Sequence, residues 1–280
     1  MTTIGKQYFV VDQNYLRTLE LETLLAADPS VRVILPDLAF LEMAKGEHQE
    51  LTVRQNLRVL AQFPGRVKVA RSVGQALRQE LDTRKATSGL IAPIASTKIV
   101  REVLGCLAAD PETAAIKRIL DQPTAHVDWL KRTFLDDEDN KSRALLLVEA
   151  IKVDTGAAFA RDVRSAKASF EDRLDFVAEQ GPSKLLSALT GSKIGFPLEK
   201  ARIFLRSKSM LLRYFYLNLW NALDWEAMGR LEGLSPKKVT NDYMDREYVL
   251  SATYFDGLLS KDRQVSAAFK ALKLLLQRRA

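Results

Sequence analysis

Short apolar runs that lead into acidic residues are the feature of this sequence that most restricts its fold. Asp12 follows the run Tyr8–Val11, Asp262 ends a second run near the C-terminus, and Glu42 follows a third run that begins at Val33–Leu35. Short, continuously apolar segments are typical of strands in a parallel sheet that is covered on both faces. Such a sheet presents polar side chains and binds ligands at its carboxyl edge. We therefore expect an α/β fold with carboxylates gathered at that edge.

The pattern along the chain divides it into two kinds of sequence. The first 85 residues alternate between strands and helices, which predicts a mostly parallel sheet with helices on its faces. The α/β pattern resumes after residue 236 and closes with an amphipathic helix over 264–279. Between these parts we expect helices at 97–109, 113–120, 141–180 and 199–231, with a break at Gly181-Pro182. The prediction is a discontinuous α/β domain, 1–85 with 236–280, interrupted by an all-helical insertion at 86–235.

Charge is distributed unevenly along the chain. The whole net charge of +7 lies in residues 51–235, and the most basic stretch runs from Arg54 to Lys85. A basic surface beside an acidic metal site suits a phosphodiester substrate. The alternative is a solvated basic surface with no partner.

Several features indicate a cytoplasmic protein without a membrane partner. Cys106 is the only cysteine, so the chain cannot form an internal disulfide, which fits a reducing compartment. No apolar stretch reaches the roughly 18 residues that span a bilayer. The N-terminus also lacks the apolar core that follows a basic start in a secretory signal.

The acids are the candidate catalytic and metal-binding residues. Asp242 and Asp245 are expected to open the helix that leads into the last apolar run, on one helical face. Carboxylates gathered at one sheet edge repel one another unless a cation lies between them. Oxygen ligands suit Mg²⁺ or Mn²⁺. The two histidines, His48 and His126, share no obvious partner, which argues against a zinc site or a histidine-based mechanism.

In this order, the acidic motifs resemble those of the PIN-domain nucleases, a family of metal-dependent phosphodiesterases. The first motif of the family is Asp-x-Asn after strand one, and the second is Glu-x-x-x-Gly on the helix after strand two. The third is an acid at the start of a later helix, and the fourth is Ser-x-Asp after the next strand. The matching segments are Asp12-Gln13-Asn14, Glu42-Met43-Ala44-Lys45-Gly46, either Asp242 or Asp245, and Ser260-Lys261-Asp262.

The resemblance implies a PIN-like fold and a role for each residue. It implies that Asp12 and Asp262 bind Mg²⁺ or Mn²⁺ directly, and that Glu42 and Asp245 bind it directly or through water. Asp242 would be an extra ligand or a helix cap. Residues that would orient ligands or contact the scissile phosphate are Asn14, Ser260 and Lys45, the last of which could instead pair with Glu42.

The expected activity is that of a metal-dependent endoribonuclease, such as a toxin or a defence effector restrained by an inhibitory partner protein. One alternative is a nuclease with the same site that cuts DNA. Another is a non-catalytic module that binds nucleic acid or protein on a PIN-like scaffold. An aspartyl phosphatase is disfavoured, because position 14 is asparagine rather than the second aspartate that such enzymes need. Homo-oligomer formation stays open.

Overall fold

The computed structural model describes residues 5–44, 48–109, 136–191, 195–228 and 231–278. Two compact units divide the chain. The first comprises Met1–Ser72, Gly89–Thr133 and Glu247–Ser266, and the second comprises Val73–Ser88, Phe134–Arg246 and Ala267–Ala280. The helix expected at 113–120 and the candidate residue Lys45 lie outside the described residues.

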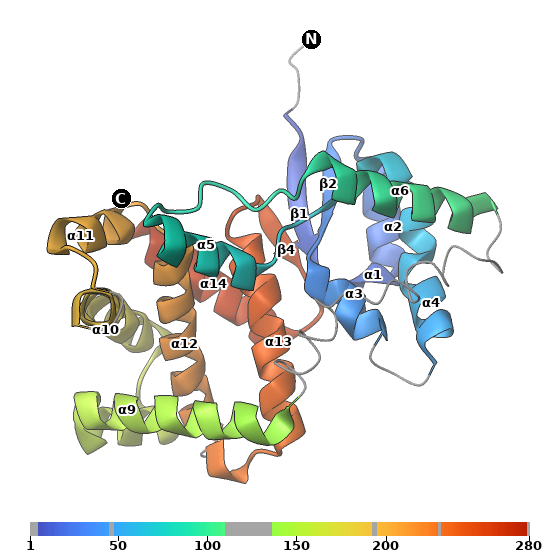
Figure 1. Cartoon of the computed structure of the whole chain (residues 1–280). Coiled ribbons are helices and arrows are strands. Elements are labelled where there is room, and N and C mark those ends of the chain that lie inside the picture. The colour runs from blue at the N-terminus through green and yellow to red at the C-terminus, as the bar shows by residue number, and fades with distance from the viewer. Residues whose placement is uncertain (1–4, 45–47, 110–135, 192–194, 229–230, 279–280) are drawn as a thin grey trace. The chain divides into compact units, whose positions relative to one another are not determined.

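A four-stranded parallel sheet forms the centre of the first unit. Its strands are β1 (Gln7–Val11), β2 (Val31–Leu35), β3 (Val67–Val69) and β4 (Gly257–Leu259), in the order β3-β2-β1-β4 (Figure 1). Val11 of β1 pairs in parallel with Leu259 of β4, which comes from the other end of the chain. The predicted α/β class and the joining of the N- and C-terminal segments in one sheet are therefore confirmed.

Helices and short turns surround this sheet in the first unit. They are α1 (Gln13–Leu16), α2 (Leu19–Ala27), α3 (Asp37–Ala44), α4 (Gln49–Ala61), the 3₁₀ turn η1 (Pro64–Arg66), α6 (Ile94–Ala109) and the end of α13 (Pro236–Ala252). The side chains of Val10, Ile34, Leu35 and Leu57 are fully buried in its core. Two caps set where the first helices begin, since Asp12 caps α1 and Thr18 caps α2 through side-chain oxygens that accept backbone N–H groups.

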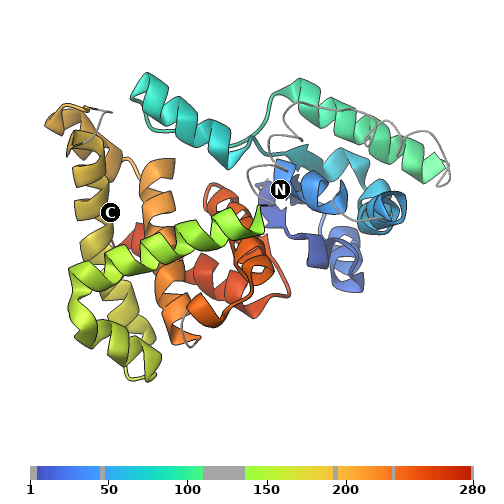
Figure 2. The same cartoon turned by 60° about the horizontal axis from the view of Figure 1, so that its bottom comes forward.

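The second unit is helical. It contains α5 (Val73–Thr83), α9 (Asp137–Arg164), α10 (Phe170–Gly191), α11 (Leu198–Arg206), α12 (Met210–Ala227), η2 (Leu231–Gly233), the start of α13 and most of α14 (Arg263–Gln277). Helix α12 packs against both α9 and α10, and Figure 2 shows the chain turning from α9 into α10. The aromatic residues of α12 supply the core, since Tyr216, Trp220 and Trp225 are each at most 2% exposed.

The limits of these units differ from the predicted domain limits at residues 85 and 236. Helix α6, expected in the insertion, packs against α4 and β3, and Arg101 donates to the carbonyls of Gly65 and Val67. Helix α5, expected with the sheet, packs against α12. An amphipathic helix reveals which face it buries but not which partner covers that face.

One predicted helix break, at Gly181-Pro182, is wrong. Gly181-Pro182 lies inside α10, and a Cβ atom at Gly181 would approach the buried ring of Tyr216 to 2.5 Å. The glycine therefore permits close approach of α10 and α12 and does not end the helix. Two breaks that the sequence did not predict fall near Ala166 and Lys208, which adopt positive φ angles of 55° and 52°.

Candidate functional site

Asp12 lies where β1 ends, beside the end of β4. Its backbone N–H donates to the carbonyl of Leu259 at 3.1 Å, which continues the β1–β4 ladder by one residue. Its side chain is buried, and Oδ1 accepts the Tyr15 N–H at 2.8 Å as the cap of α1. The Ser260 side chain also interacts with this carboxyl and lowers its pKa. The backbone bond to Leu259 and the bond from the Tyr15 N–H hold Asp12 at the carboxyl edge of the sheet.

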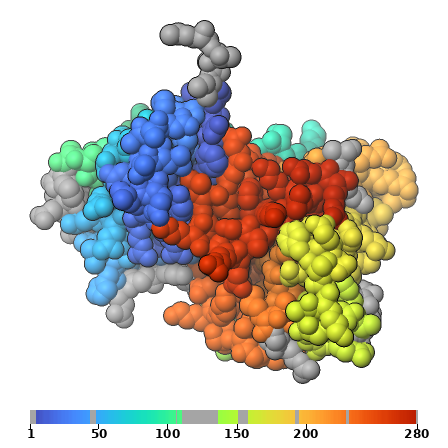
Figure 3. All heavy atoms as spheres, turned by 180° about the vertical axis from the view of Figure 1, so that it is seen from behind, coloured from blue at the N-terminus to red at the C-terminus, as the bar shows by residue number. Residues whose placement is uncertain are grey.

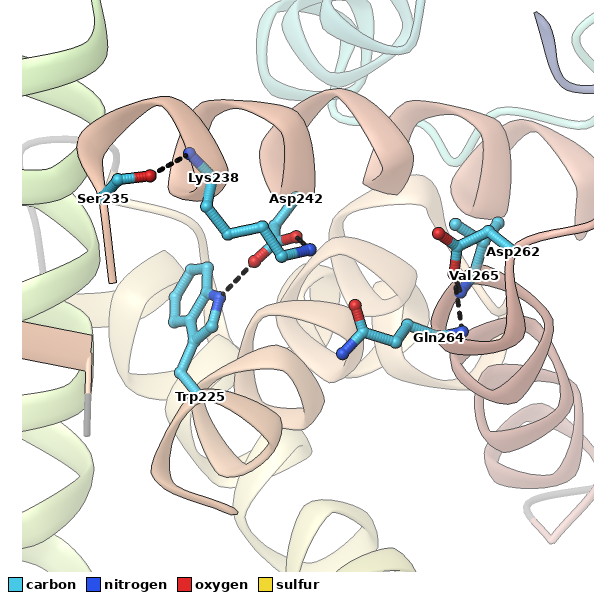
Figure 4. Close-up of polar contacts among 7 residues, drawn as sticks. All are labelled: Trp225, Ser235, Lys238, Asp242, Asp262, Gln264 and Val265. Carbon is cyan, nitrogen blue, oxygen red and sulfur yellow. Dashed lines mark hydrogen bonds and ion pairs between the residues drawn. The ribbon is translucent and has the colours of Figure 1, made fainter. Parts of the chain in front are cut away.

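Asp262 lies beyond β4 and caps α14. Its Oδ1 accepts the backbone N–H groups of Gln264 at 2.7 Å and Val265 at 3.1 Å (Figure 4). Its own N–H donates to the Ser260 hydroxyl at 3.0 Å. The Ser260 side chain also lowers the pKa of the Asp12 carboxyl, so it interacts with both acids. Asp12, Ser260 and Asp262 all lie within the first unit.

Burial and a neighbouring negative charge both disfavour ionisation of Asp12. Burial raises the pKa of the Asp12 carboxyl, and the negative charge of Asp262 raises it further. Hydrogen bonds from Ser260 and from the backbone at Tyr15 act in the opposite direction. A pKa raised by burial and by a like charge means that ionising both acids is costly without a positive charge nearby.

Glu42 lies on α3 and has a partner that the sequence motifs did not indicate. The Tyr248 hydroxyl donates to Glu42 Oε2 at 2.5 Å, and Tyr248 is itself buried. This bond connects the helix after β2 to the C-terminal segment within the first unit. The sequence offers one signal for this contact, since Tyr248 lies on the apolar face of α13. A buried tyrosine hydroxyl usually forms a hydrogen bond.

Two further residues expected at this edge are Asn14 and Lys45, and a nearby acid, Asp256, lies at the opposite end of the strands. Asn14 is exposed on α1, and Lys45 lies outside the described residues. Asp256 precedes β4, and its carboxylate accepts the Tyr8 N–H at 2.6 Å. It therefore tethers the amino-terminal end of the β1–β4 pair and takes no part in the carboxyl edge.

Asp242 has a structural environment inside the second unit. Its carboxylate accepts the indole N–H of Trp225 at 2.8 Å and pairs with Lys238 at 2.6 Å (Figure 4). The expectation that Asp242 and Asp245 open a helix is wrong, because α13 already begins at Pro236, where a proline costs no hydrogen bond. Both acids lie mid-helix, and Asp245 is half-buried.

The described residues contain no group of three or more histidine, cysteine, aspartate or glutamate side chains arranged to hold a metal ion. What they bring together is the pair Asp12 and Asp262 with the Ser260 hydroxyl. This donor set fits Mg²⁺, which is usually bound by one or two carboxylates and keeps several waters. These are oxygen donors, the type of ligand that hard metal ions prefer.

None of the described helices has the length and apolar character needed to cross a membrane. Comparison of the chain with protein-family models, curated proteins and solved structures gave no match.

Proposed function

We propose that this chain is a metal-dependent nuclease that hydrolyses phosphodiester bonds in RNA at the Asp12–Asp262 pair. One observation carries the proposal. Two acids from opposite ends of the sequence meet at the carboxyl ends of adjacent parallel strands, where the pKa of the buried Asp12 is raised. That edge is where parallel α/β sheets bind ligands.

Each of the site residues in the first unit would have a separate role in metal binding and hydrolysis. Asp12 and Asp262 would bind Mg²⁺ or Mn²⁺. Ser260, which accepts the Asp262 N–H and interacts with the Asp12 carboxyl, would orient them. Glu42, held by Tyr248, would act through a water molecule. When bound, the ion lowers the pKa of a water and stabilises charge on the phosphate. Participation of Asp242 or Asp245 stays a prediction from the sequence.

Cationic side chains near the same edge support a polyanionic substrate. Arg17 follows α1, and Arg263 follows Asp262 directly. Both are exposed. Lys261, between Ser260 and Asp262, pairs with exposed Glu20 at 2.8 Å. A phosphate chain could therefore approach the acids along exposed positive charge. The preference for RNA over DNA comes from the resemblance to PIN-domain nucleases alone.

The test is a cleavage assay with labelled RNA and single-stranded DNA of the same sequence, in Mn²⁺, Mg²⁺ or EDTA. Asp12→Asn and Asp262→Asn should each lower the rate by about 100-fold or more, because each removes a charged metal ligand. Asparagine is also a good helix cap, so both variants should fold. Asp256→Asn makes the same change at the other end of the strand pair and should retain activity.

The outcomes separate the competing functions. Cleavage of DNA alone, lost in both variants, would assign the site to a DNA nuclease. Salt-sensitive binding that is indifferent to EDTA, with no cleavage, would indicate a non-catalytic module. Unchanged cleavage in both Asp12→Asn and Asp262→Asn would contradict the proposal outright.

A further inference from the structure

A hollow in the second unit lies between the end of α9 and the start of α10. Its volume is about 530 Å³, and it lies within one compact unit of the described chain. Its lining combines two aromatic rings with four carboxylates and one lysine: Phe159, Asp162, Lys167, Ala168, Asp172, Asp175, Phe176 and Glu179. The nuclease proposal uses none of these residues.

The two aromatic rings stack on each other. The ring centroids of Phe159 and Phe176 are 4.9 Å apart, with 26° between the ring planes. Both side chains are only half-buried, so part of this apolar surface faces the hollow. Aromatic faces attract cations, and they stack well with the planar guanidinium group of arginine.

The carboxylates are arranged along one helical face. Asp172, Asp175 and Glu179 are three and four residues apart on α10, a spacing that places them on the same side of a helix. Asp162 joins them from α9. All four are exposed. In the described part of the chain, the carboxylates of Asp162 and Glu179 form no hydrogen bond or ion pair.

An arginine of the chain itself already binds at the rim. Arg278 Nη2 contacts Glu171 at 2.5 Å, and Nη1 binds Asp175, so one guanidinium group bridges two carboxylates of α10. In Figure 3 the C-terminal residues, in red, lie against the α9–α10 region, in yellow. The acidic face of α10 therefore already binds one guanidinium group, that of Arg278. Asp162 and Glu179 are available to bind a second cation.

We propose that this hollow docks an arginine-bearing segment of a partner protein. The guanidinium would stack on the Phe159–Phe176 pair and bind Asp162 and Glu179. The chain carries a net charge of +7, so a basic peptide is repelled by the protein as a whole. Binding of such a peptide therefore requires a local acidic surface, and this inference is independent of nuclease activity.

The test measures the fluorescence anisotropy of a labelled oligoarginine peptide titrated with the full-length protein. The double variant Asp162→Asn/Glu179→Gln should weaken binding about tenfold, as expected for the loss of two exposed ion pairs. Glu138→Gln/Glu199→Gln changes the net charge equally at exposed positions outside the hollow and should bind as wild type. Phe159→Leu should reduce the preference for oligoarginine over oligolysine of the same length.

Other results would overturn the proposal. If both double variants bind oligoarginine equally weakly, the effect comes from the net charge of the protein and not from the hollow. No binding of oligoarginine at low salt would exclude the site. Self-association of the wild-type protein that is lost in Asp162→Asn/Glu179→Gln, without peptide binding, would assign the hollow to a second copy of the chain. Circular dichroism confirms folding of each variant, and the substituted acids are all exposed.

Discussion

Glu80 carries the sharpest stability prediction, because its buried carboxylate caps a core helix from a distant part of the sequence. Its side chain is fully buried. Oε1 accepts the backbone N–H groups of Thr87 at 2.7 Å and Met210 at 2.8 Å, and Oε2 accepts that of Leu211 at 2.9 Å. Two of these donors belong to the first turn of α12, where backbone N–H groups have no partner within the helix.

The size of the effect follows from the number of donors left without an acceptor. Glu80→Ala removes all three charge-assisted bonds, each worth about 1.5–3 kcal/mol. Ser209 still caps α12 and water can enter part of the space, so we expect a loss of about 4 kcal/mol. Glu80→Gln keeps one oxygen but turns an amide N–H₂ toward a backbone donor, which should cost about 2 kcal/mol.

The assay is urea unfolding followed by circular dichroism, with the midpoint compared at constant slope. Glu199→Gln is a control, because Glu199 is 76% exposed and pairs with its helical neighbour Arg202. That variant should stay within about 0.5 kcal/mol of wild type. The reasoning is refuted if both Glu80 variants unfold as the control does, or if Glu80→Gln loses more stability than Glu80→Ala.

Three further predictions test individual contacts. Burial raises the pKa of Asp224 to about 6 against the lowering effect of Arg173, so the folded chain binds this proton more tightly than the unfolded chain. The stability that this protonated carboxyl contributes is present at low pH and is lost as the pH rises through about 6. Between pH 4 and pH 7, the free energy of unfolding of the wild type should therefore fall by about 2 kcal/mol relative to that of Asp224→Asn. Urea unfolding at each pH measures this difference. Gly181→Ala should destabilise the fold by about 1–3 kcal/mol despite the better helix propensity of alanine, because its Cβ would overlap the ring of Tyr216; an increased thermal midpoint would contradict this. Tyr248→Phe should cost about 1–2 kcal/mol by removing the hydrogen bond to Glu42, and a melting curve identical to that of wild type would show that the bond contributes nothing.

The strands and the acids that follow them could be predicted from the sequence, because each depends on local pattern. The segment Val33–Leu35 is continuously apolar and lies in β2, which has the predicted bounds Val31–Leu35. The run before Asp12 forms β1, which pairs with β4 as expected. Buried parallel strands need continuous apolar residues, so their position can be read directly.

The partners of helices could not be read in this way. Helix α6 packs on β3 and α5 packs on α12, the reverse of the predicted assignment to domains. The carboxylate of Asp242 binds Trp225 and Lys238 inside the second unit, although its position in the motif order suggested a metal ligand.

The sequence by itself determined that this chain forms a parallel sheet from its two ends, with Asp12 and Asp262 following adjacent strands. Strand formation depends on a local pattern of apolar residues, which can be read from the sequence. Asp12 follows the end of β1 by one residue, and Asp262 follows the end of β4 by three. Only the tertiary structure decided the partners of Glu42, Glu80 and Asp242. The partners lie on other helices, at another turn of the same helix or, for Thr87, in the segment after α5. The donors that a buried carboxylate meets therefore depend on how these parts pack.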